Sequence, residues 1–132
     1  MYPAAIEDYV RPQSIAEALE AVGRYEAGDA LFVAGGQSVM QAMKTRLVRP
    51  RCIVDLQAVA ELRGVSADGS GVRIGAMTPY AALAEESSLD GAYQALRDAA
   101  ARVGDRQVRN RGTIGGSLCW NYIAACMPPV AL

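Results

Sequence analysis

LFVAGGQSVMQAMK, residues 31–44, is the stretch that decides the fold. Its apolar start, Leu31 to Ala34, predicts a buried strand that ends at Gly35-Gly36. A helix is then expected with Ser38 as its N-cap and an apolar stripe of Val39, Met40, Met43 and Leu47. Such a turn binds phosphate when free N–H groups and the helix dipole face the anion. By itself, the pattern is equally typical of a tight turn in which glycine supplies an unusual backbone angle.

Composition narrows the class of protein. The 132 residues suffice for one domain with a core, and the net charge of −1 gives no support to nucleic-acid binding. No apolar run is long enough to cross a membrane, and the N-terminus lacks the pattern of an export signal. Cys52, Cys119 and Cys126 form no CxxC pair, which favours free thiols in a reducing cytoplasm over disulfides or a zinc site. Because histidine is absent, we expect no catalytic side chain and no metal site, and a cofactor is then the natural source of chemistry.

The first half of the chain predicts an α/β arrangement. We expect an extended segment from Tyr2 to Pro12, and a helix that begins with the capping box of Ser14 and Glu17 and stops at Gly28. The expected inward face of that helix consists of Ile15, Ala18, Leu19, Val22 and Tyr25. A strand from Arg51 to Leu56 would complete a βαβ unit with parallel pairing and a right-handed crossover. Ligands of such units bind beyond the carboxyl ends of the strands, where Gly35-Gly36 lies.

The second half predicts a hairpin followed by helices. Strand signals at Leu62–Val65 and Val72–Ala76 flank a turn-rich segment, so antiparallel pairing is expected. A short helix is expected with Thr78 as N-cap and Pro79 at its first position, and a longer one from Ala92 to Val103. A boundary between subdomains is expected in the segment 57–61. The final residues, 127–132, indicate the opening of a helix and suggest the front part of a longer chain.

A second glycine pair lies in QVRNRGTIGGS, residues 107–117. We expect a loop here, in which the N–H groups around Gly115-Gly116 form an anion-binding nest and Thr113 and Ser117 add hydroxyls. A plain surface loop with the solvated arginines Arg106, Arg109 and Arg111 is the equal alternative. Two glycine-pair loops in one small domain favour a dinucleotide, whose pyrophosphate would lie between them.

FVAGGQSVMQAMKTRL, VDLQAVAELRGV, IGAMT and GDRQVRNRGTIGGSLC resemble the FAD-binding (medium) subunit of molybdenum hydroxylases, the xanthine dehydrogenase and aerobic carbon monoxide dehydrogenase relatives. The likeness runs from about Tyr9 to Pro129. It implies an α+β fold of the vanillyl-alcohol-oxidase type (a PCMH FAD-binding domain), in which a small α/β subdomain precedes a mixed, largely antiparallel one. The expected spans are 1–57 and 58–132, the second being incomplete at its C-terminal end.

The resemblance also implies a cofactor site. The residues that it implies as cofactor-binding in this chain are Val33, Ala34, Gly35, Gly36, Gln37, Ser38, Val39, Thr78, Val103, Thr113, Ile114, Gly115, Gly116 and Ser117. In this scheme the segment 34–39 wraps the FAD pyrophosphate, and 113–117 holds the pyrophosphate and ribityl side from opposite. Val103 would lie near the cofactor and Thr78 near the flavin, although an N-cap role explains Thr78 equally well.

One position departs from the family pattern. Cys126 stands where an aspartate is expected, and a thiol is a weak substitute for a carboxylate acceptor, so either binding differs there or Asn121 compensates.

The resemblance implies an electron-relay subunit that passes electrons from the clusters of an iron–sulfur subunit to FAD and on to an external acceptor, beside a molybdopterin subunit. The alternatives are a stand-alone flavin oxidoreductase of the same fold, and a nucleotide-binding or structural subunit without flavin.

Overall fold

The computed structural model describes residues 5–132, and its chain divides into two compact units, 1–61 and 62–132. The dividing point follows Glu61, the last residue of the segment 57–61 in which the sequence suggested a boundary. The first residues of the extended segment expected from Tyr2 lie outside the described residues.

The first unit is a three-stranded parallel sheet with two helices. Its elements are β1 (Asp8–Val10), α1 (Ile15–Gly23), β2 (Ala30–Val33), α2 (Val39–Lys44), β3 (Cys52–Asp55), and the 3-10 turns η1 (Leu56–Ala58) and η2 (Ala60–Leu62), the second of which ends in the second unit. The strand order is β1-β3-β2, and β3 pairs in parallel with both neighbours. The predicted βαβ unit with parallel pairing is therefore confirmed for β2, α2 and β3.

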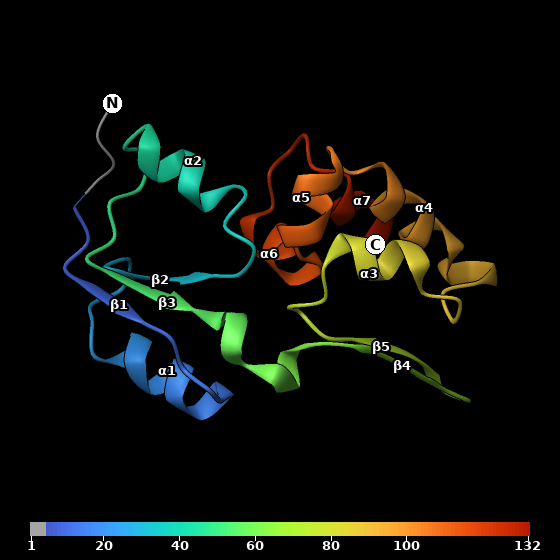
Figure 1. The fold of residues 1–132 in the computed structure, drawn as a ribbon, viewed down its shortest axis with the longest axis horizontal. Helices are drawn as coiled ribbons and strands as arrows, with labels where there is room; N and C mark the ends of the chain where they lie inside the picture. Colours follow the sequence, from blue (N-terminus) through green and yellow to red (C-terminus); the bar gives the residue numbers. More distant parts are fainter. Residues whose placement is uncertain (1–4) are drawn as a thin grey trace. The chain divides into compact units, whose positions relative to one another are not determined.

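The core of this unit lies on both faces of β3, whose residues are all buried. Figure 1 shows α1 and α2 on opposite sides of the sheet. Cys52 and Val54 pack with the small residues Ala18 and Ala21 of α1. The predicted helix faces were partly wrong, because Ile15, Leu19, Met40 and Leu47 are exposed and Ala21 and Ala42 are buried instead.

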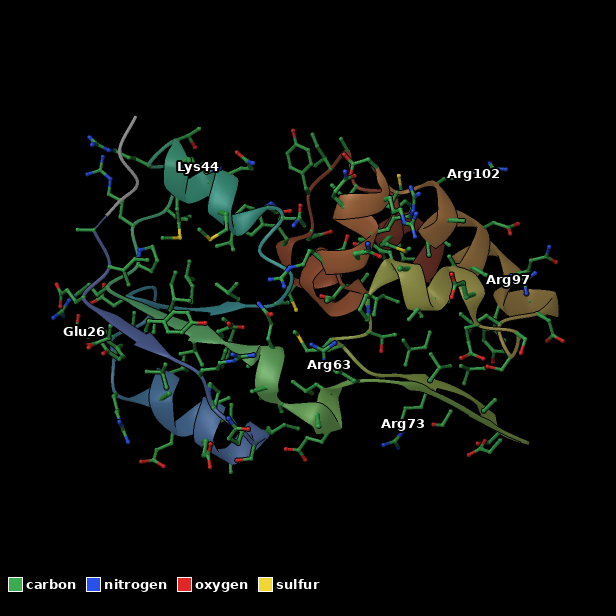
Figure 2. All side chains as sticks on the ribbon, viewed as in Figure 1. Glu26, Lys44, Arg63, Arg73, Arg97 and Arg102 are labelled. Atoms are coloured by element: carbon green, nitrogen blue, oxygen red, sulfur yellow. The ribbon has the colours of Figure 1, made fainter. Side chains whose placement is uncertain are left out.

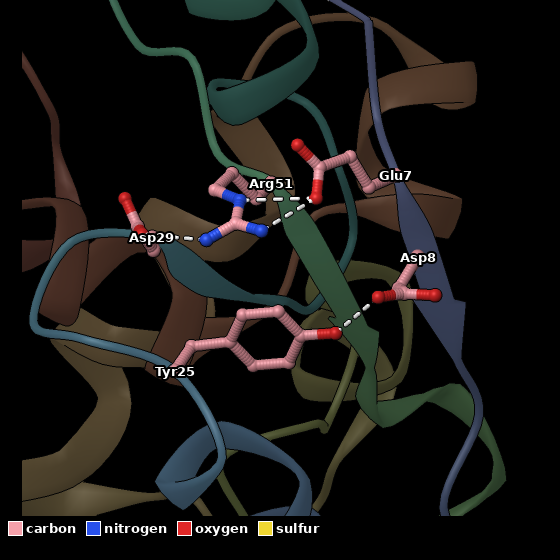
Figure 3. A network of polar contacts seen from close by, with 5 residues as sticks. All are labelled: Glu7, Asp8, Tyr25, Asp29 and Arg51. Carbon is pink, nitrogen blue, oxygen red and sulfur yellow. Dashed lines mark hydrogen bonds and ion pairs between the residues drawn. The ribbon is translucent and has the colours of Figure 1, made fainter.

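A polar network joins the amino ends of the strands, at the edge opposite the glycine turn (Figure 3). The Arg51 guanidinium donates from Nε and Nη2 to Glu7 Oε2 at 3.0 and 2.8 Å, and its Nη1 lies 3.5 Å from Asp29 Oδ2. Tyr25 donates its hydroxyl to Asp8. The Arg51 hydrogen bond lowers the pKa of the Glu7 carboxyl.

The second unit combines one hairpin with helices. It contains β4 (Val65–Asp68), β5 (Gly71–Ile74), α3 (Tyr80–Glu85), η3 (Gly91–Tyr93), α4 (Gln94–Arg102), α5 (Arg106–Arg111), α6 (Ile114–Trp120) and α7 (Met127–Ala131). The antiparallel pairing of β4 with β5 confirms the hairpin, with its first strand displaced along the chain from the predicted position. Together the two units form the predicted α+β fold, but residues 62–132 are mainly helical with one antiparallel hairpin, so the expectation of a largely antiparallel second part was wrong for them.

The core of the second unit is built by its helices. Tyr80 and Leu83 of α3 pack with Leu89, Ala100 of α4 and Ile114 of α6. The hairpin adds partly buried apolar side chains to the same cluster.

Among residues 5–132, no helix has the length and apolar character needed to cross a membrane.

Candidate functional site

The first predicted segment is the turn between β2 and α2. Val33 ends β2 and pairs in register with Asp55 of β3, so the turn lies at the carboxyl edge of the sheet. Gly36 has a φ of +75°, in the left-handed region that glycine adopts without steric cost. Ser38 occupies the N-cap position of α2, as predicted, but its side chain makes no capping hydrogen bond.

The backbone amides of this turn are free. Residues of this turn act only as acceptors for the first helical hydrogen bonds. The Met40 N–H donates to the Gly36 carbonyl at 3.2 Å, and the Ala42 N–H donates to the Ser38 carbonyl at 3.1 Å. Within residues 5–132, no N–H from Gly35 to Val39 donates a hydrogen bond. Gln37 and Ser38 are exposed and Gly35 and Gly36 are half-buried, so the donors of these four residues are at least partly accessible, whereas Val39 is buried. The arrangement fits a diphosphate, which needs several N–H donors on one short segment.

The second predicted segment is not a loop, and that expectation was wrong. Residues 106–111 form α5 and 114–120 form α6. The reason is local capping: Asp105 accepts from the Val108 N–H at 2.8 Å, and Thr113 Oγ1 accepts from the Gly116 N–H at 3.1 Å.

The expected anion-binding nest at Gly115-Gly116 is also wrong, because its amides are occupied. The N–H of Ile114 donates to the carbonyl of Thr78 at 3.3 Å, and that of Gly115 donates to the carbonyl of Ala76 at 2.9 Å. Gly116 donates to the Thr113 side chain, and Ser117 to the Thr113 carbonyl at 3.1 Å. Polar contacts from this segment to a ligand would therefore come from side-chain hydroxyls.

Thr78 holds the backbone rather than capping a helix. Pro79 is the N-cap of α3, so the predicted capping role of Thr78 was wrong. The Thr78 hydroxyl is buried, donates to the Gly64 carbonyl at 3.1 Å and accepts from the Gly64 N–H at 3.0 Å. An isolated bridge between Pro79 and Thr113 places Thr78 beside the start of α6. The structure thus brings Thr78, Thr113, Ile114 and Gly115 together within the second unit.

The remaining predicted positions lie in the same unit. Val103 packs against the core cluster that contains Ile114, and its carbonyl accepts from Arg109 Nη1 at 3.3 Å. Burial raises the pKa of Tyr80, and the neighbouring Ser117 side chain opposes that shift. Tyr80 was not predicted to be near the site, and no motif in the sequence marks it. Cys126, which is exposed, precedes α7 without a capping hydrogen bond.

No residue set in the described part of the chain resembles a metal site. Within residues 5–132, no three histidine, cysteine, aspartate or glutamate side chains are grouped so that they could hold an ion. The three cysteines are free, with Cys52 buried and the other two exposed. The free amides between β2 and α2, which suit a phosphate-bearing ligand, are the candidate site in the described part of the chain.

Comparison with known proteins decides the family. Residues 4–132 match the family described as "FAD binding domain in molybdopterin dehydrogenase". The chain belongs to this family of FAD-binding domains. The predicted family, the α+β FAD-binding fold and FAD as the cofactor of the family are confirmed.

Individual relatives of this FAD-binding domain are subunits of larger enzymes. The carbon monoxide dehydrogenase medium chain of Hydrogenophaga pseudoflava is 40% identical over 122 residues, which is 92% of this chain and 42% of the relative. The caffeine dehydrogenase subunit beta of Pseudomonas sp. (strain CBB1) is 32% identical over 130 residues, 98% of this chain and 43% of the relative. The reconstituted CO dehydrogenase structure from Oligotropha carboxidovorans superposes with a TM-score of 0.90 at 38% identity, over 97% of this chain and 44% of that one. The domain thus spans less than half the length of these relatives.

Proposed function

We propose that this chain is the FAD-binding part of an electron-transfer subunit in a molybdenum-containing hydroxylase or dehydrogenase. In this role it relays electrons from the clusters of an iron–sulfur subunit to an external acceptor, beside a molybdopterin subunit. The observation that carries the proposal is the row of free amides from Gly35 to Val39, within a domain of the FAD-binding family. Three free thiols support a reducing, cytoplasmic location.

The cofactor contacts divide into two sets with different chemistry. We assign Ala34 to Val39 to the FAD diphosphate, held by the free N–H groups that follow β2. Thr113 to Ser117 and Val103 are assigned to the rest of the cofactor, through hydroxyls and apolar contact. The Thr113 oxygen accepts from Gly116 and its side chain is buried, so Thr113 acts by holding α6 in place, whereas the half-buried Ser117 keeps a partly accessible side chain. Thr78, with its hydroxyl bound to Gly64, acts by fixing this region.

The protein supplies positioning in this mechanism. When bound, FAD supplies redox chemistry that couples one-electron donors to two-electron acceptors. The chain contains no histidine, and the relay needs no acid or base from its side chains. The relatives are named as chains and subunits of dehydrogenases, which favours a relay over a stand-alone flavin enzyme.

The decisive experiment places a negative charge beside the free amides. Ser38→Asp in the full natural chain puts a carboxylate at the N-terminus of α2, where it stabilises the protein without cofactor by a few tenths of a kcal/mol. The same charge repels the FAD diphosphate, so FAD affinity should fall at least about tenfold. Ser38→Asn is the matched neutral control and should bind FAD nearly as the wild type does.

Fluorescence titration with FAD and chemical denaturation measure the two effects. Loss of affinity with unchanged or raised stability supports the diphosphate assignment. Equal FAD affinity of Ser38→Asp and Ser38→Asn would remove this turn from the site. A wild-type full chain without flavin absorption after reconstitution with FAD would contradict the cofactor role, and would favour the flavin-less subunit suggested by Cys126.

A further inference from the structure

The turn between α4 and α5 is closed by one side chain, that of Arg109 on α5. Its Nη1 atom donates to the Val103 carbonyl at 3.3 Å and to the Gly104 carbonyl at 3.1 Å. Carbonyl groups at the end of a helix lack partners within the helix, and a cation placed there also interacts favourably with the helix dipole. The nine-residue α4 ends at Arg102, so Arg109 supplies its donors just beyond that end.

The backbone alone does not close this turn. The N–H of Val103, which caps α4, donates to the Ala100 carbonyl at 3.4 Å. Within residues 5–132, neither Gly104 nor Asp105 donates a backbone hydrogen bond to α4, although Gly104 has a left-handed φ of +48°. Helices with such an ending usually close it through backbone N–H groups. Here a side chain from the next helix takes their place.

Arg109 carries a charge that no carboxylate neutralises in the described part of the chain. It is half-buried and forms no ion pair there. A guanidinium removed from water is usually paired with a carboxylate, because its desolvation is costly. Arg102 (Figure 2), in the last turn of α4, is by contrast exposed and has no hydrogen bond or ion pair among residues 5–132. The hydrogen bonds to the turn, rather than an ion pair, therefore fix where Arg109 lies.

The residue that this turn presents is Val103. Its side chain is half-buried and packs against the core cluster that contains Ile114. We propose that Arg109 is a positioning residue of the cofactor site, and that its two hydrogen bonds hold Val103 where it contacts FAD. The inference rests on the proposed function, which assigns Val103 to apolar contact with the cofactor. Because one side chain closes the turn, a substitution of Arg109 should displace Val103 and leave the free amides between β2 and α2 unchanged.

Two substitutions of Arg109 in the full natural chain separate its hydrogen bonds from its bulk. Arg109→Met retains an apolar stem but has no donor. Arg109→Lys retains the charge, and its single ammonium can donate to both carbonyls because both hydrogen bonds come from one nitrogen atom. Arg102→Met is the matched control, since it removes an exposed arginine from the same end of α4.

Fluorescence titration measures FAD affinity, and the visible circular dichroism of bound FAD reports the surroundings of the flavin ring. Arg109→Met should weaken FAD binding about tenfold, as expected for the loss of charged hydrogen bonds, and should change the dichroism. Arg109→Lys should restore both to near the wild-type values. Arg102→Met should change FAD affinity less than about twofold.

A double-mutant cycle shows whether Arg109 acts through Val103. Val103→Ala should itself weaken FAD binding, and adding Arg109→Met to it should cause less than about a twofold further loss. Full additivity of the two losses would overturn the proposal, because Arg109 would then act independently of Val103. Val103→Ala leaves Arg109 in place, so wild-type FAD affinity in this variant overturns the proposal even if Arg109→Met does not fold.

The remaining outcomes separate this role from a purely structural one. Weaker binding and altered dichroism in Arg109→Met, both restored in Arg109→Lys, support the positioning role. A lower unfolding midpoint of Arg109→Met with wild-type FAD affinity and dichroism overturns it, because Arg109 would then only stabilise the end of α4. A wild-type chain that binds no FAD contradicts the proposed function itself, and this inference with it.

Discussion

At the scale of single residues, Gly115 is required by the close approach of another backbone. A Cβ atom at this position would lie 2.5 Å from Ala76 Cβ and 2.7 Å from the Ala76 carbonyl oxygen. The same glycine donates its N–H to that carbonyl. We therefore expect Gly115→Ala to lower the free energy of unfolding by about 1–3 kcal/mol, measured by chemical denaturation of the full chain without FAD.

Gly23 provides the control for this prediction. It ends α1, and a Cβ there would meet no atom within 4 Å. Gly23→Ala should leave stability unchanged or raise it by up to about 1 kcal/mol, because alanine favours the helix. Equal effects of the two substitutions would contradict the packing explanation for Gly115.

The two glycine pairs show how far single residues can be predicted. The sequence located both pairs as special positions, and resemblance to a family supplied a common role. The structure separates them, since the amides at 35–39 are free and those at 114–117 are bonded within the second unit. That difference depends on Ala76 and Thr78, which lie far from Gly115 in sequence, so no local pattern could reveal it.

At the scale of elements, residues 107–117 were expected to be a loop because glycine and asparagine disfavour helices. The caps at Asp105 and Thr113 outweigh that propensity. We predict that Asp105→Ala lowers the free energy of unfolding by about 1 kcal/mol, since the Val108 N–H loses its acceptor. Asp105→Asn keeps an acceptor and should retain most of the stability. Chemical denaturation measures both, and equal losses would show that the cap hydrogen bond does not stabilise α5.

The strands and the helix faces differed in how well the sequence determined them. Strand β3 was predicted because a parallel strand covered on both faces reads as a continuous apolar run. The helix faces were misjudged because large apolar residues were assigned inward. In the structure, α1 buries the small residues Ala18 and Ala21, and α2 buries Ala42 beside the correctly predicted Val39 and Met43.

At the scale of the whole molecule, the cofactor and the family followed from motifs spread over most of the chain, while composition alone excluded only broad classes of protein.

Folding also shifts the pKa values of several side chains through charge and burial, and no sequence motif reveals these shifts. Burial raises the pKa of Tyr80, and a hydrogen bond to Asp8 raises that of Tyr25. Groups whose pKa is raised by folding stabilise the protein below the ordinary tyrosine value and lose that contribution as pH rises through the folded value.

Folding lowers the pKa values of several carboxyls, so their contribution to stability is lost at low pH, and a substitution of Glu7 tests this. Hydrogen bonds lower the pKa values of Glu7, Asp68 and Glu86, with Arg51, Ser70 and Ser88 as the respective partners. Carboxyls whose pKa is lowered by folding contribute stability above their unfolded pKa, near 4 for such groups, and lose that contribution as pH falls through the folded pKa.

Glu7→Gln should therefore lower the thermal unfolding midpoint at neutral pH, and its difference from the wild type should vanish as pH falls toward about 2. Glu26→Gln is the control, because Glu26 forms no ion pair in the part of the chain that the structure describes. If the difference in unfolding midpoint between Glu7→Gln and the wild type stayed constant with pH, the contact with Arg51 would stabilise the protein through packing rather than charge.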